Sequence, residues 1–196
     1  MHISRRTALL LGGAPLVALA GGAVMVNRKV NPHTALAYEL PRDAGVRREA
    51  TPQCDDHEPT GSVTEGPFYK RDTPERSVLR EAATVGAPLT LRGRVLTPDC
   101  RPVVGAVVDV WSCDGAGVYD NETFRLRGHQ FTDAAGTFAF ETVKPGDYKD
   151  FGIHRTPHVH VKVQGRGTRL LTTQLFFPGE ALNEQDWFFD EKLLVR

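Results

Sequence analysis

The sequence predicts an all-β fold, with an antiparallel β-sandwich core and an extended amino-terminal arm. The 196 residues include 19 glycines and 13 prolines, which favour turns over long helices. From Pro88 onward, short segments with strand character alternate with glycine- and proline-rich turns, the pattern of a sandwich or barrel. We therefore divide the chain into an export signal (1–37), a linker and extended arm (38–85) and a sandwich core (86–196).

Five segments carry the strand prediction. Two of them alternate apolar and polar residues, and the others are rich in β-branched, aromatic or aliphatic residues. Turn clusters, such as the one that begins at Thr97-Pro98, separate them. The predicted strands cover residues 89–96, 103–111, 137–140, 158–163 and 170–177.

The overall charge excludes one class of function. Lysine plus arginine and aspartate plus glutamate both total 24, so the formal net charge is zero. A protein that binds nucleic acid needs a basic excess to neutralise phosphates. No nucleic-acid partner is therefore expected.

The amino terminus has the pattern of a twin-arginine (Tat) export signal. The arginine pair in Ser4-Arg5-Arg6 precedes an apolar stretch over residues 8–26. This pattern predicts recognition by the Tat machinery and a periplasmic or extracellular location. Small residues offer cleavage sites at 35–37 and 18–20; the alternative is an uncleaved signal that anchors the protein in the membrane.

The three cysteines, Cys54, Cys100 and Cys113, all follow this signal. An oxidising compartment permits a disulfide. Cys100 and Cys113 flank a turn and a strand, so they could face each other across neighbouring strands. The odd count then leaves Cys54 unpaired, or the pairing is reversed.

Two histidines, His158 and His160, lie two positions apart in a predicted strand. Because side chains alternate between the faces of a strand, both imidazoles project from one face and the intervening valines from the other. Two imidazoles on one face make half a metal site. The alternative is a solvated strand face that happens to carry two histidines.

Tyr119, Tyr148 and Arg155 are further candidates. A tyrosinate is a hard anionic ligand, and two of them with two imidazoles suit Fe(III). Each tyrosine follows a glycine-containing turn, so capping a core edge is the alternative role. Arg155 precedes His158 by three residues and could stabilise negative charge on a substrate; the alternative is a surface arginine.

The sequence resembles the intradiol ring-cleavage dioxygenases, the non-haem Fe(III) enzymes that open catechol rings, in the catechol and protocatechuate dioxygenase group. The Arg-x-x-His-x-His element at 155–160 is the most specific part. The resemblance covers about residues 60–180. The other matching segments are Thr64–Tyr69, Pro102–Trp111, Gly117–Tyr119, Arg127–Gln130, Thr132-Asp133, Gly136, Pro145–Tyr148 and Thr173–Phe177.

This resemblance implies a β-sandwich and a complete set of site residues. It implies that Fe(III) is the cofactor and that a small aromatic diol is cleaved by O2 to a muconate-type dicarboxylate. Tyr148 corresponds to the ligand that substrate displaces. Arg155 and Gln174 correspond to residues beside the substrate, Trp111 is expected in the core, and Cys113 and Cys100 resemble the cysteines of the exported branch. The implied iron ligands are Tyr119, Tyr148, His158 and His160.

Two other functions are alternatives to intradiol ring cleavage. The first is an exported, non-catalytic β-sandwich that binds aromatic ligands. The second is an extradiol enzyme, whose Fe(II) is held by two histidines and one carboxylate. Phe176 stands where many members of the family have tyrosine, and the identity of the diol stays open. A homo-oligomer is allowed by the sequence but not specified by it.

Overall fold

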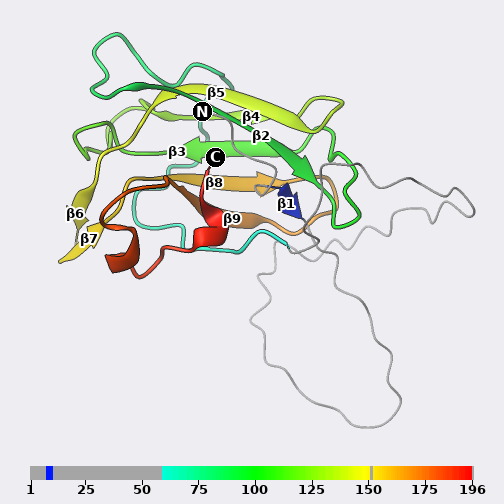
Figure 1. The fold of residues 1–196 in the computed structure, drawn as a ribbon. Helices are drawn as coiled ribbons and strands as arrows, with labels where there is room; N and C mark the ends of the chain where they lie inside the picture. Colours follow the sequence, from blue (N-terminus) through cyan, green and yellow to red (C-terminus); the bar gives the residue numbers. More distant parts are fainter. Residues whose placement is uncertain (1–7, 11–58, 151, 196) are drawn as a thin grey trace, which may run out of the picture.

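The computed structural model describes residues 8–10, 59–150 and 152–195 (Figure 1). The predicted export signal and linker lie almost entirely outside these residues, so the boundaries at 37 and 85 stay predictions. The described elements are β1 (Ala8–Leu10), β2 (Pro88–Leu96), β3 (Val107–Trp111), β4 (Arg127–Phe131), β5 (Thr137–Val143), β6 (Tyr148–Asp150), β7 (Ile153–Arg155), β8 (His158–Gln164), β9 (Leu171–Phe176) and the 3-10 helices η2 (Asn183–Gln185) and η3 (Glu191–Leu193).

Two sheets form the sandwich and a short hairpin extends from it. One sheet has the strand order β1-β2-β5 and the other has the order β4-β3-β8-β9. Among the named strands, all pairings are antiparallel except that of β1 with β2. The hairpin β6–β7 projects at one end of the sandwich (Figure 1). The prediction of an all-β antiparallel sandwich is confirmed.

The core lies between the two sheets, and strand alternation fills it. The three valines of β8 are fully buried there, against Phe140 of β5 and Val108 of β3. Burying one such side chain contributes about 1.5–3 kcal/mol. The odd-numbered residues of β8 are thereby held inward, which leaves its even-numbered residues on the opposite, outer face.

The register of the four-stranded sheet aligns one row of buried side chains across this outer face. Trp111 of β3 pairs with Arg127 of β4 on one side and with His160 of β8 on the other. His160 also pairs with Gln174 of β9. All four side chains are at most 1% exposed. A second layer of the protein must therefore cover this face.

The extended arm provides that cover. It crosses the four strands in order: Val63 donates its N–H to Thr172 of β9, and Glu65 forms an ion pair with Lys162 of β8. The hydroxyls of Tyr69 and Thr73 then bind Asp109 of β3 at 3.3 and 2.9 Å. Finally, residues 74–76 pair with β4 at His129.

The strands differ from the prediction at two places. β3 begins at Val107 rather than at residue 103, because Gly105 has φ +68° and the Thr132 hydroxyl bonds both Val103 O and Ala106 N. β4 was not predicted, because its inner face carries Gly128 and Gln130 instead of apolar side chains; the missing Cβ of Gly128 leaves room for Leu79. The hairpin β6–β7 was not predicted either.

Of the cysteine pairings that the sequence leaves open, the structure excludes the one between Cys100 and Cys113. Cys113 is a free, buried thiol whose Sγ lies 3.4 Å from the Gly146 carbonyl, whereas Cys100 is in a disulfide. The third cysteine, Cys54, lies outside the described residues. Positions that flank a turn and a strand need not bring their side chains together. In the described part of the chain, no helix is long and apolar enough to cross a membrane.

Candidate metal centre

His158 and His160 sit side by side on the outer face of β8, as their spacing predicts. Their Nε2 atoms are 3.1 Å apart, and both side chains are 1% exposed. The Thr156 carbonyl lies 2.6 Å from His158 Nδ1, so that nitrogen carries the proton and Nε2 keeps its lone pair. Burial lowers the pKa of His158 to about 3 and that of His160 well below its usual range. Both imidazoles are therefore neutral and suited to bind a metal.

Tyr119 and Tyr148 bring two phenols to the same place. The Tyr148 hydroxyl lies 3.4 Å from His158 Nε2, and the two tyrosine rings meet edge to face at 5.3 Å. The Tyr119 hydroxyl is buried and has no hydrogen-bond partner among the described residues. Burial raises the pKa of both phenols, so a strong Lewis acid is needed to ionise them near neutral pH.

Aromatic rings from the arm and from β3 pack against the two histidines and two tyrosines, which together are called the donor set. Phe68 stacks on Tyr119 with centroids 4.2 Å apart, and Trp111 stacks on His160 at 4.7 Å. Trp111 is buried, as predicted, and it also packs against the candidate metal ligand His160. Phe68 belongs to the motif 64–69, which thus both packs on the sandwich and contacts the site.

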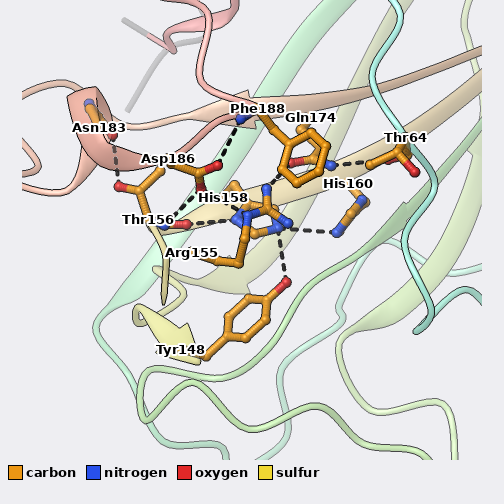
Figure 2. A network of polar contacts seen from close by, with 10 residues as sticks. All are labelled: Thr64, Tyr148, Arg155, Thr156, His158, His160, Gln174, Asn183, Asp186 and Phe188. Atoms are coloured by element: carbon orange, nitrogen blue, oxygen red, sulfur yellow. Dashed lines mark hydrogen bonds and ion pairs between the residues drawn. The ribbon is translucent and has the colours of Figure 1, made fainter. Parts of the chain in front are cut away.

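Arg155 lies beside the histidines in a polar network shown in Figure 2. Its Nη2 donates to Gln174 Oε1 at 2.5 Å, and its Nε donates to Asp186 Oδ2 at 2.9 Å. Gln174 Nε2 in turn donates to the Thr64 carbonyl of the arm at 3.0 Å. Arg155 and Gln174, which the resemblance implies lie beside a substrate, are thus directly bonded to each other.

The segment 183–190 also contributes to the site, which was not predicted from the sequence. Asp186, Asn183 and Phe188 all reach Arg155 or its neighbour Thr156. They follow the last strand without a periodic pattern, and a buried aspartate in a loop cannot be told from an exposed one by sequence. The apolar run Trp187-Phe188-Phe189, directly after Asp186 and beyond the last strand, was the available signal.

The donor set fits Fe(III). It offers two neutral imidazoles and two phenols, and one buried phenol lacks a partner in the described residues. Among the described residues, no group of three or more His, Cys, Asp or Glu could hold a metal ion. The two-histidine, one-carboxylate site of an extradiol enzyme therefore has no counterpart in that part of the chain.

The fold and the site define the class of protein as a β-sandwich with a candidate two-tyrosine, two-histidine metal centre. A family model described as "Dioxygenase" matches residues 64–190. The chain therefore belongs to this dioxygenase family, and its resemblance to the intradiol dioxygenases is confirmed.

Individual relatives agree with the family. The chain is 30% identical over 141 residues to a catechol 1,2-dioxygenase of Candida albicans, covering 60% of this chain and 46% of the relative. It is 39% identical over 111 residues to a chlorocatechol 1,2-dioxygenase of Pseudomonas sp. strain P51, covering 47% and 44%. It spans about half the length of the curated relatives it matches.

One solved structure is more similar to this chain in sequence than these two relatives are. It is the dioxygenase domain of a dioxygenase–carbohydrate-binding protein fusion from Streptomyces sp. SirexAA-E, with 46% identity and a TM-score of 0.66. The match covers 70% of this chain and 86% of that one. A hydroxyquinol 1,2-dioxygenase from Pseudomonas putida DLL-E4 matches at 32% identity and TM-score 0.63, covering 70% and 56%.

Proposed function

We propose that the chain catalyses intradiol cleavage of a catechol-type aromatic diol by O2, with Fe(III) as cofactor. The product is a muconate-type dicarboxylate that contains both oxygen atoms of O2, so no external reductant is consumed. One observation carries the proposal: Tyr119, Tyr148, His158 and His160 meet on one face of the sheet, next to Arg155.

The four side chains would hold the iron through two imidazole nitrogens and two phenol oxygens. When bound, Fe(III) supplies Lewis-acid activation and accepts electron density from the diol. The chain provides neutral imidazoles, because burial keeps both histidines unprotonated. It also provides phenols whose ionisation would offset the ferric charge.

The side chains have distinct roles toward the diol. Tyr148 is half-buried at the base of the hairpin β6–β7, whereas Tyr119 is buried beneath Phe68. Tyr148 is thus the phenol better placed to leave when a diol binds, and its oxygen would then take a proton from a diol hydroxyl. Arg155 would stabilise the negative charge that develops on the diol. Phe68 and Trp111 line the donor set with rings that limit access of water.

Substrate and location form part of the proposal. Relatives are named for catechol, chlorocatechol, hydroxyquinol and protocatechuate, which share the adjacent hydroxyls that the site requires. The twin-arginine motif supports export through the Tat machinery in a folded state, to the periplasm or beyond the cell. The proposal does not depend on the oligomeric state, which has to be measured separately.

The test measures metal content and the visible spectrum of the exported protein. We expect stoichiometric iron and a broad tyrosinate-to-iron absorption band that shifts when catechol is added. Ring cleavage is then followed under O2 with catechol, protocatechuate and hydroxyquinol in parallel. A protein that stays colourless after iron reconstitution, yet binds these diols, would overturn the proposal in favour of a non-catalytic binding module.

A further inference from the structure

The segment that follows β9 brings a buried carboxylate to Arg155. The Asp186 side chain is fully buried, and its Oδ2 accepts both Arg155 Nε and the Thr156 N–H at 2.9 Å. Its Oδ1 accepts the N–H of Phe188 at 2.9 Å. A buried ion pair with all its oxygens bonded is a geometrically defined contact, and loss of one partner leaves an uncompensated charge.

The rest of the guanidinium is held as well. Gln174 binds Nη2, and the Phe188 ring lies 4.6 Å from Cζ and covers one face of the group. Among the described residues, Nη1 is the guanidinium nitrogen left without a hydrogen bond. A planar group fixed at two nitrogens and one face has one orientation, with its remaining donors presented in a set direction.

We propose that Asp186 is a positioning residue for the ring-cleavage reaction. It acts through Arg155: by binding Nε it fixes the guanidinium so that Nη1 faces the bound diol. The inference rests on the proposed function. Asp186 lies outside the sequence motifs that predicted the site. The proposal therefore adds the segment 183–190 to the residues that support the reaction.

A purely structural role for Asp186 is the competing explanation, since it also binds two backbone N–H groups. A double-mutant cycle separates the two roles. Asp186→Asn in the wild-type background should lower kcat about 10- to 100-fold with iron content unchanged, because a small misplacement of a catalytic group is costly. In the Arg155→Met background, the same substitution should cause no further loss. An equal loss in both backgrounds would overturn the proposal.

Asp190→Asn is the matched control. Asp190 lies in the same segment and its side chain accepts the Lys192 N–H, where it caps η3 and makes no contact with Arg155. We expect its kcat to stay within about twofold of wild type, as for a substitution away from the reacting groups. A loss as large as that of Asp186→Asn would mean that the segment, not its carboxylate at 186, matters.

A second readout uses the metal-free protein and needs no turnover. In 1H–15N spectra, the Nε–H signal of Arg155, assigned by its absence in Arg155→Met, should exchange slowly with solvent. Asp186→Asn should accelerate this exchange at least about tenfold, and Asp190→Asn should not. Fast exchange in the wild type would refute the positioning role even if Asp186→Asn does not fold. If the exchange is slow but the protein cleaves no diol, the Asp186–Arg155 contact is confirmed and the proposed function is refuted.

Discussion

Gly117 lies where the segments that carry the two tyrosines touch, and replacing it with alanine should disturb both. It has φ +77°, and a Cβ at this position would lie 2.3 Å from the Asp147 carbonyl oxygen and 3.0 Å from the Tyr148 Cβ. Both neighbours belong to backbone or to the root of a side chain, so neither can rotate away. The chain must therefore separate the Gly117–Tyr119 segment from the strand that begins at Tyr148.

The size of the effect follows from two contributions. A non-glycine residue in the left-handed region costs about 1–2 kcal/mol. Overpacking a close contact adds about 1–3 kcal/mol. Gly179 has the same φ of +77° but nothing within 4 Å of its would-be Cβ, so Gly179→Ala isolates the backbone cost. We expect Gly117→Ala to lower the free energy of unfolding by about 2–5 kcal/mol, and Gly179→Ala by about 1–2 kcal/mol.

Urea denaturation of the two variants measures the difference in the free energy of unfolding. In thermal melting, the Tm should fall by about 2–4 °C for each kcal/mol lost. In the iron-loaded protein, the tyrosinate band should weaken or shift for Gly117→Ala and stay unchanged for Gly179→Ala. Equal destabilisation by the two substitutions, with both bands unchanged, would show that the close approach of the two tyrosine-bearing segments is not needed.

Three further predictions concern the site and the arm. Tyr148→Phe should retain part of the iron but slow diol binding in stopped-flow mixing, because it removes the oxygen that accepts the proton; unchanged turnover would remove Tyr148 from that role. His160→Ala should lose the iron by elemental analysis while His129→Ala, on β4 of the same sheet, keeps it; full retention in both would exclude His160 as a ligand. Burial raises the pKa of Asp109, so the folded state holds its proton more tightly than the unfolded chain does and the ionised form costs stability. The stability of Asp109→Asn relative to wild type should therefore increase as the pH rises from 4 through the pKa of the folded state; a flat difference in urea titrations would contradict this.

Much of the fold could be predicted because its signals are local. Alternation in 89–96 and 158–163 placed β2 and β8 within a residue or two, and it correctly assigned the valines of β8 to the core. β4 was not predicted because its inner face carries Gly128 and Gln130, so the strand shows no alternation of apolar and polar residues. The short hairpin β6–β7 escaped for a related reason, since three-residue strands are too short to show a period.

The sequence by itself determined that His158 and His160 share a face, because strand geometry fixes the direction of neighbouring side chains. It also offered Tyr119, Tyr148 and Arg155 as candidates by residue type and position, and the resemblance to a known family implied their roles and added Gln174. The contact of Asp186 with Arg155, the free thiol of Cys113 and the path of the arm across four strands were decided by the tertiary structure. Such contacts join residues that are tens of positions apart, and their distance depends on how the sheets and loops pack together. No local pattern in the chain encodes that packing.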